Sequence, residues 1–233
     1  MGVPTLFQLP DNAELSAKYQ TLITPAGWAF AIWGLIFTMQ AVWAILQLAI
    51  PEYRSSQQVT KGVAYNYILV CAFQVAWTFA FALEQMTMSM MWMVGILVGL
   101  YRIYMAQETL VLAAASNNSS TGDYWLLRFP FGLHFGWIIA ATLVNANVVI
   151  VAYKAPASFQ FGAALATLGI ATVVALGVLI YEAKSKLPTK LQPNVVIPLV
   201  LVWALVSALL FSHALPCLAV NMQRSCFDTG FPE

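Results

Sequence analysis

Six long apolar stretches dominate the pattern of hydrophobic and polar positions along the chain. They span residues 24–50, 63–84, 87–115, 125–153, 159–181 and 194–220. Each is long enough to cross a bilayer, which takes about 20 helical residues at a rise of about 1.5 Å per residue. The pattern therefore predicts an integral membrane protein whose fold is an all-α polytopic bundle of six transmembrane helices.

Composition agrees with a membrane protein rather than a soluble one. Apolar residues make up 61% of the chain and charged residues 8%, against roughly 45–50% and 25% in soluble domains. The formal net charge of +1 gives no electrostatic case for binding nucleic acid. We therefore expect membrane lipid as a partner, and a homo-oligomer or a larger membrane complex stays open.

The basic residues between the stretches predict an orientation. Loops 51–62 and 182–193 and the start of the fourth stretch hold six of them: Arg54, Lys61, Lys184, Lys186, Lys190 and Arg128. The opposite ends hold three: Lys18, Lys154 and Arg224. Because cytosolic, matrix or stromal loops carry the excess of Lys and Arg, we expect both termini on the non-cytosolic side. The first 23 residues show no targeting signal, so the compartment, an organelle or the bacterial inner membrane, stays open.

The three cysteines are too few for a disulfide framework. Cys71 falls within the second stretch, where we expect a small buried apolar residue. Cys217 and Cys226 flank the end of the last stretch on the predicted non-cytosolic side, where a disulfide can persist. They are either a bridge that pins the tail or two unrelated thiols near a membrane surface.

Ionisable side chains inside apolar stretches are costly and therefore informative. Glu108 and Arg128 lie at similar depths on consecutive predicted helices, which favours an ion pair. Arg102 lies deeper and has no partner that the sequence makes obvious. Two interpretations stay open: these groups hold the bundle together, or they line a polar ligand cavity.

His134 is an intramembrane imidazole in the fourth stretch. It can serve as an axial ligand to the metal of haem or chlorophyll, or it can donate a hydrogen bond to a ligand. The commoner role of a lone intramembrane histidine is a hydrogen bond between helices. All three roles are kept as hypotheses.

Three tryptophan-containing motifs follow one another along the chain. They are Pro25-Ala-Gly-Trp28-Ala-Phe30-Ala-Ile-Trp33-Gly-Leu-Ile-Phe37, Gln74-Val-Ala-Trp77-Thr-Phe-Ala-Phe81, and Pro130-Phe131 followed by Trp137-Ile-Ile-Ala-Ala141-Thr-Leu-Val-Asn145. In order and composition they resemble helices of the TspO family, the tryptophan-rich sensory or translocator proteins. The resemblance covers residues 24–153, and the last two stretches have no counterpart in five-helix members.

The resemblance implies a cavity between helices that binds porphyrins or other hydrophobic ligands. Carried onto this chain, it places these residues at the cavity: Trp33, Phe37, Gln74, Trp77, Phe81, Trp137, Ala141 and Asn145. His134 becomes a candidate axial ligand of a tetrapyrrole, whether porphyrin, haem or chlorophyll. The resulting organisation is an N-terminal arm at 1–23, a TspO-like region at 24–153, two additional helices at 154–220 and a polar tail at 221–233.

We therefore expect a non-enzymatic sensor, carrier or transporter of a hydrophobic ligand, with a tetrapyrrole favoured. The alternative is an accessory subunit of a respiratory or photosynthetic membrane complex that holds lipid or pigment. An enzyme is the least favoured class. Two histidines and nine acids, the acids mostly in loops, do not assemble a catalytic Ser/His/Asp set, an acid pair or zinc spacing.

Overall fold

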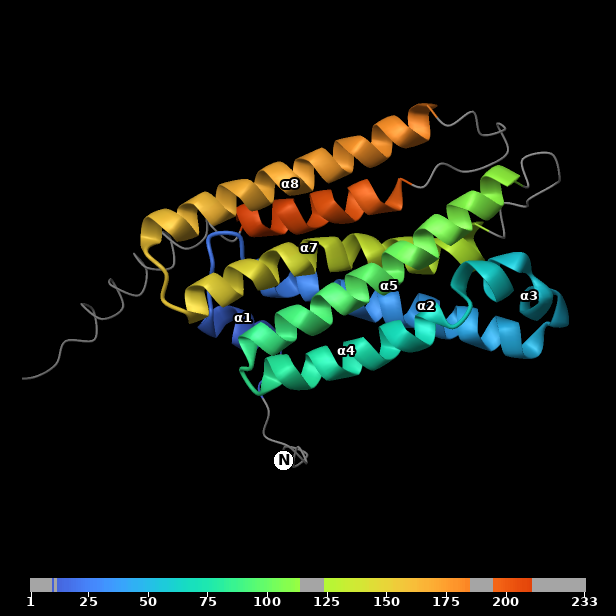
Figure 1. Ribbon diagram of the computed structural model, residues 1–233, viewed down its shortest axis with the longest axis horizontal. Helices are drawn as coiled ribbons and strands as arrows, with labels where there is room; N and C mark the ends of the chain where they lie inside the picture. Colours follow the sequence, from blue (N-terminus) through green and yellow to red (C-terminus); the bar gives the residue numbers. More distant parts are fainter. Residues whose placement is uncertain (1–9, 11, 114–123, 185–194, 211–233) are drawn as a thin grey trace, which may run out of the picture.

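A computed structural model of the protein describes residues 10, 12–113, 124–184 and 195–210 (Figure 1). Over these ranges its regular elements are helices, which confirms the all-α class. In chain order they are α1 (Asn12–Lys18), η1 (Gly27–Ala31), α2 (Ile32–Ala49), α3 (Pro51–Ser55), η2 (Gln58–Val63), α4 (Asn66–Ala82), α5 (Met86–Ala113), η3 (Tyr124–Arg128), α7 (Phe129–Ala152), α8 (Ala157–Lys184) and the unlabelled helix Val196–Leu210.

Four helical segments are long and apolar enough to cross a membrane. They are Gly27–Ala49, Met86–Leu112, Tyr124–Ala152 and Ala157–Lys184. Two further apolar helices, α4 and Val196–Leu210, are shorter. All six predicted stretches thus contain a helix. The protein is an integral membrane protein, and four of its helices are long and apolar enough to span the bilayer.

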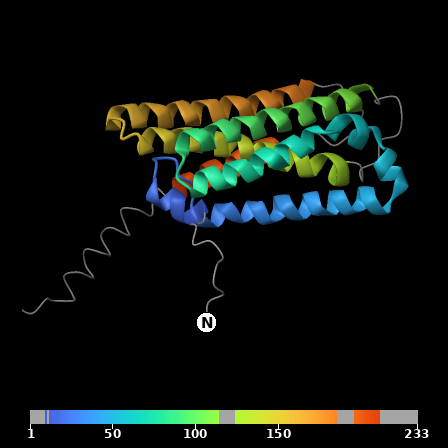
Figure 2. The ribbon, with the colours of Figure 1, turned by 60° about the horizontal axis from the view of Figure 1, so that its bottom comes forward.

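The long helices run side by side along one axis, with α7 at the centre of the bundle (Figures 1 and 2). In the apolar 18-residue core of the segment that contains α7, 50% of the residues are buried, against 17% in that of α8. α4 and α5 form an antiparallel hairpin, and α5, α2 and α8 each contact α7. α8 is therefore a peripheral helix, and most of its surface faces away from the protein.

Small residues set the closest helix contacts. A Cβ atom added to Gly99 on α5 would lie 2.6 Å from Val70 Cγ2 on α4, and one added to Gly95 would lie 2.9 Å from the Phe73 ring. A Cβ atom added to Gly136 on α7 would lie 3.2 Å from the Cα atom of Ile197. Close backbone approach increases the van der Waals contact that holds helices together in lipid, where the hydrophobic effect between helices is absent.

Three expectations need correction or qualification. The connection 51–62, predicted as a loop, contains the short helices α3 and η2. Pro51 begins α3, and η2 packs Gly62 against Gln107 of α5. The N-terminal arm contains α1, which contacts α4. Cys71 is exposed rather than buried, because apolar side chains are as stable facing lipid as facing the core. Cys217 and Cys226 lie outside the described residues.

The α4–α5 contact predicts how two matched glycine variants behave. Gly99→Ala places a methyl group against Val70, and overpacking of this kind costs about 1–3 kcal/mol. Gly169→Ala on α8 meets no atom within 4 Å and gains helix propensity of up to about 1 kcal/mol. Thermal unfolding in detergent should show a lower midpoint for Gly99→Ala alone. Equal midpoints for the two variants would contradict the tight α4–α5 contact.

Candidate functional site

An aromatic cluster surrounds Trp33 of α2. Its ring centroid lies 5.3 Å from that of Phe37, 6.1 Å from that of Trp137 and 6.4 Å from that of Trp77. The cluster therefore joins α2, α4 and α7, and its outermost members in sequence, Trp33 and Trp137, are more than 100 residues apart. Edge-to-face and stacked pairs of this kind add about 0.5–1.5 kcal/mol each beyond the burial of their area.

A cavity lies against this cluster. Its volume is about 40 Å³, and part of it is open to the outside. The walls therefore stand close together. The cavity is lined by Asn12, Ser16, Pro25, Phe30, Trp33, Trp77, Phe81, Met93, Trp137, Ala140, Ala141, Val144, Asn145 and Val148.

Most of the residues expected at a ligand cavity do meet at this one. They are Trp33, Trp77, Phe81, Trp137, Ala141 and Asn145. The other two lie elsewhere: Phe37 stacks on Trp33 from outside and is 51% exposed, and Gln74 lies on α4 outside the cavity lining. Phe81 stacks on Trp77 at 5.3 Å, one helical turn further along α4.

The cavity also contains residues that the sequence reasoning missed. On α7 these are Ala140, Val144 and Val148, which follow Trp137 at helical spacing and so share its face. The periodicity could have identified them. Asn12 and Ser16 of α1 could not be found in this way, because α1 lies outside the apolar stretches.

α1 is held across the end of the cavity by the turn between α4 and α5. Lys18 Nζ lies 2.6 Å from Glu84 Oε1, and the Tyr19 hydroxyl donates a hydrogen bond to Glu84 Oε2. The hydrogen bond from Lys18 lowers the pKa of Glu84 from its ordinary 4.5, and the same bond raises the pKa of Lys18. Leu15, on the inner side of α1, is buried, so this helix makes both apolar and ionic contacts.

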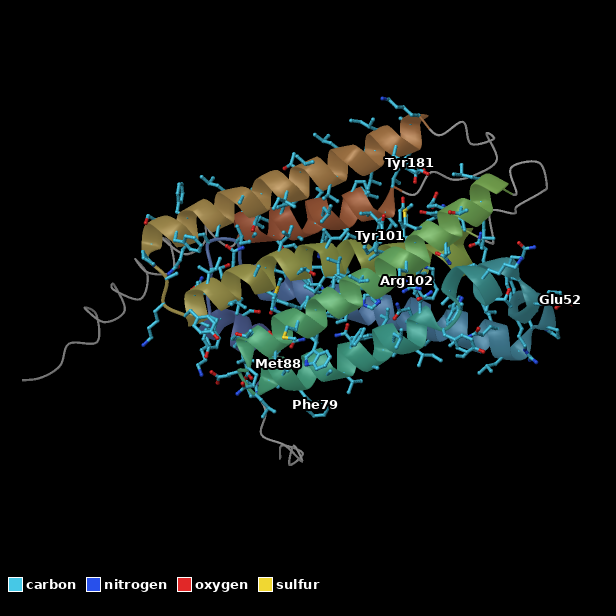
Figure 3. The ribbon with its side chains drawn as sticks, viewed as in Figure 1. Glu52, Phe79, Met88, Tyr101, Arg102 and Tyr181 are labelled. Atoms are coloured by element: carbon cyan, nitrogen blue, oxygen red, sulfur yellow. The ribbon has the colours of Figure 1, made fainter. Side chains whose placement is uncertain are left out.

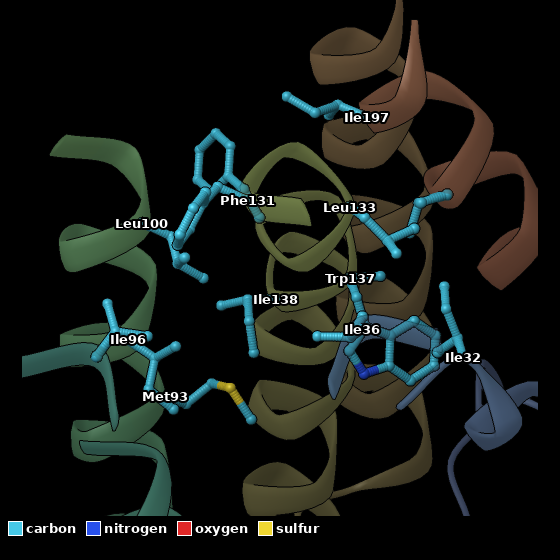
Figure 4. Close-up of a cluster of buried hydrophobic side chains, with 14 of the residues drawn as sticks. Ile32, Ile36, Met93, Ile96, Leu100, Phe131, Leu133, Trp137, Ile138 and Ile197 are labelled. Carbon is cyan, nitrogen blue, oxygen red and sulfur yellow. The ribbon is translucent and has the colours of Figure 1, made fainter. Parts of the chain in front are cut away.

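The cavity wall carries buried hydrogen-bond donors. The Nε1 atoms of Trp77 and Trp137 are buried and have no acceptor among the described residues. Figure 4 shows the Trp137 ring, with its nitrogen, beside the side chains of Ile32 and Ile36. The amide of Asn145 bonds to the Ser89 hydroxyl at 3.3 Å. The lining contains no ionisable side chain, so it suits an uncharged, mainly apolar ligand surface.

His134 is buried behind Trp33 rather than in the cavity lining. Gln40 donates its amide hydrogen to His134 Nδ1 at 2.9 Å, and the Tyr67 hydroxyl donates to the Gln40 carbonyl at 3.0 Å. With Nδ1 as an acceptor, the neutral ring carries its hydrogen on Nε2. This arrangement links α2, α4 and α7, and it is the helix-to-helix hydrogen bond that the sequence analysis kept as one hypothesis. It gives no support for an axial metal ligand.

The ionisable residues of the spans divide into two kinds. Arg128 forms a buried ion pair with Glu108, as the sequence predicted, and its guanidinium lies 5.6 Å from the centre of the Tyr124 ring. This pair joins α5 to the start of α7, and neither residue lines the cavity. Arg102 is exposed and has no ion pair within the described part of the chain. No cluster of three or more potential metal ligands occurs among the described residues.

Comparison with known proteins adds one match. A family model described as TSPO-like protein matches residues 4–220. The matched region includes α1 and the last two apolar helices as well as the TspO-like motifs. Comparison with curated proteins and with solved structures found no match.

The ionic contacts of α1 predict its response to pH. Because the pKa of Glu84 is lowered and that of Lys18 is raised, the contact is complete between about pH 4.5 and 10.5, their ordinary values. It is lost as pH falls through the lowered pKa of Glu84 or rises through the raised pKa of Lys18. A spin label at Ala17→Cys, in a background without native cysteines, should be immobile at pH 7 and more mobile below pH 4.

Substitution provides the matched test of the same contact. Glu84→Gln should make the label mobile at pH 7, whereas Glu52→Gln, an exposed acid on α3, should not. A label that remains immobile in Glu84→Gln would show that apolar contacts alone hold α1 in place.

Proposed function

We propose that this chain, which belongs to the TSPO-like family, is a membrane protein that binds a flat hydrophobic ligand and does not transform it. The observation that carries the proposal is the cavity walled by Trp33, Trp77 and Trp137 from three helices. Flat aromatic walls favour a flat conjugated ligand, because stacking and apolar burial then act over the whole ring face.

A tetrapyrrole is the favoured ligand. The cavity has a volume of about 40 Å³, well below the roughly 300–1,000 Å³ of small-molecule sites. The narrow interior means that the aromatic walls must separate to admit a macrocycle. Because the lining has no histidine and no cation, we propose a metal-free porphyrin whose carboxylates remain at the mouth of the cavity, close to Lys18.

The residues of the cavity support binding rather than catalysis. Ser16 is the lining residue closest in type to a nucleophile, but the lining holds no histidine, lysine or carboxylate to activate it. α1 covers the end of the cavity and is held by exposed polar contacts. Ligand entry at that end requires α1 to move. A helix that opens and closes the cavity is what a sensor, carrier or transporter needs to control ligand entry.

An accessory role in a larger membrane complex is the second candidate, and α8 is the observation that favours it. Of its 28 residues, those buried are Ala164, Thr167, Ala171 and Glu182. The remaining surface presents large apolar side chains such as Phe161, Val173 and Ile180. That surface contacts lipid or a partner subunit, and ligand-binding experiments distinguish the two functions.

We further propose that all six apolar helices cross the membrane. α4 has 17 residues, about 25 Å, and the helix Val196–Leu210 is the described part of a longer apolar stretch. Six crossings place both termini on one side. The excess of basic residues in the loops of the other side favours a non-cytosolic location for the termini.

Truncation of a wall residue should weaken ligand binding. Trp137→Ala should raise the Kd for protoporphyrin at least tenfold, about 1.4 kcal/mol, because it removes a buried aromatic anchor. Trp125→Ala, which removes a 47% exposed tryptophan, should leave the Kd unchanged. Quenching of the remaining tryptophans during titration in detergent measures both. Absence of saturable binding of any tetrapyrrole to the wild type would favour the accessory role.

A titration with haem in place of protoporphyrin, read by absorption, tests His134. Because its ring is outside the cavity lining and its Nδ1 accepts from Gln40, His134→Ala should leave the absorption spectrum of bound haem unchanged. A change in that spectrum would restore the axial-ligand hypothesis.

The orientation can be measured in sealed vesicles. Lys61→Cys and Lys154→Cys, each introduced into a background without native cysteines, lie at opposite ends of the bundle. An impermeant maleimide should label Lys61→Cys from the cytosolic face and Lys154→Cys from the other face. The reverse pattern would overturn the proposed orientation.

A further inference from the structure

An apolar groove runs along the outer surface of the bundle, separate from the aromatic cavity. Its walls come from three helices and include Leu97, Val98 and Tyr101 on α5, Phe135 and Ile139 on α7, and Ile170 on α8. The space within it is about 400 Å³. Because it opens sideways from spanning helices, its natural occupant is a hydrocarbon chain rather than water.

One end of the groove is closed by aromatic rings. The ring centroid of Phe135 lies 6.3 Å from that of Tyr101 and 5.6 Å from that of Tyr104. Tyr101 is 52% exposed, so its ring forms the rim at this end.

Arg102 follows Tyr101 on α5, one helical turn beyond Val98, and lies just outside the lining of the groove (Figure 3). It is exposed, and none of the ion pairs or hydrogen bonds between described residues involves it. An unpaired guanidinium on a spanning helix is costly unless it reaches the membrane surface or a counter-charge.

The depth of Arg102 allows it to reach lipid phosphate. It lies 16 residues after Met86 on α5, about 24 Å along the helix axis, and the hydrocarbon core is about 30 Å thick. It is also close to the level at which α4 begins, since a Cβ on Gly99 would lie 3.9 Å from the Asn66 carbonyl oxygen. A long arginine side chain at this level extends to the headgroup layer.

The described residues supply no carboxylate that a second copy could bring to Arg102. The acids in the described ranges are on α1 and α3, in the α4–α5 turn, or buried: Glu14, Glu52, Glu84, Glu108 and Glu182. None of them lies on the outer surface of a spanning helix. The membrane itself offers phosphate as a counter-charge for Arg102.

We propose that the groove and Arg102 together form a binding site for an anionic phospholipid. One acyl chain lies in the groove against α5, α7 and α8, and the phosphate pairs with the guanidinium, which matches its geometry with two parallel hydrogen bonds. Arg54 and Lys61 lie at the same end of the bundle, on the surface that the proposed orientation assigns to the cytosolic leaflet. That leaflet carries the anionic lipids.

Native mass spectrometry can test the site with defined lipids. The full chain is released from nanodiscs that contain equal amounts of phosphatidylglycerol and phosphatidylcholine with identical acyl chains. One phosphatidylglycerol should stay bound about fivefold more often than phosphatidylcholine, the ratio expected for about 1 kcal/mol from one surface cation. Arg102→Gln should reduce this ratio to about one, and Arg102→Lys, which keeps the charge but loses the two parallel hydrogen bonds, should retain only part of it.

Two further variants separate the groove from general surface charge. Lys61→Gln removes an exposed cation on the same side of the membrane and should leave the ratio unchanged. Ile170→Trp fills the groove from α8, where Ile170 is 50% exposed, and should reduce retention of both lipids. Elution as a single species in gel filtration shows that each variant is folded.

Three results would overturn the proposal. The first is equal retention of the two lipids by the wild type. The second is an equal loss of preference in Lys61→Gln and Arg102→Gln, which would indicate general surface charge. The third is a wild-type dimer that Arg102→Gln converts to a monomer with no change in lipid retention, which would assign the groove to a second copy of the chain.

Discussion

Within a bilayer no water can satisfy a buried polar group, and this constraint organises the whole bundle around α7. Three polar side chains of the α7 segment have partners on three different neighbouring helices. Arg128 pairs with Glu108 on α5, and His134 accepts from Gln40 on α2. Asn147 donates to Thr167 on α8 at 2.8 Å. Since each unmade bond would cost several kcal/mol in hydrocarbon, these contacts fix the rotation and depth of the neighbouring helices relative to α7.

The aromatic cavity depends on that arrangement. Once Gln40 and His134 set α2 against α7, Trp33 comes within 6.1 Å of Trp137, and α4 brings Trp77 to the same cluster. The polar contacts lie behind or below the rings, so the cavity wall itself stays apolar apart from the indole N–H groups and the amides. The polar groups that hold the helices together are thus separate from the apolar surface that faces the ligand, although both lie on the same helices.

Charged side chains are stabilised differently in the interior of the bundle and at the membrane surface. Inside, Glu108 and Arg128 neutralise each other at about 4% exposure. At the membrane surface, Lys18, Tyr19 and Glu84 use exposed contacts that solvent screens. The interior pair is therefore suited to permanent structure, whereas the surface contact is suited to a helix that moves. This contrast is the physical basis for assigning α1, rather than any spanning helix, to the opening of the cavity.

The sequence by itself determined the helical class, the positions of the apolar helices and the ion pair of Glu108 with Arg128. These follow from local composition, because a span in lipid must be apolar and helical, and a buried charge needs a partner of opposite sign. The tryptophan motifs also identified most of the cavity wall. Only the tertiary structure decided that Phe37 faces outward, that Cys71 is exposed and that α1 closes the cavity. In lipid an apolar side chain is equally stable on the inner and outer surfaces of a helix, so hydrophobicity does not encode which way the helix is turned. That rotation is fixed by contacts between residues far apart in the chain, such as Gln40 with His134 and Asn147 with Thr167.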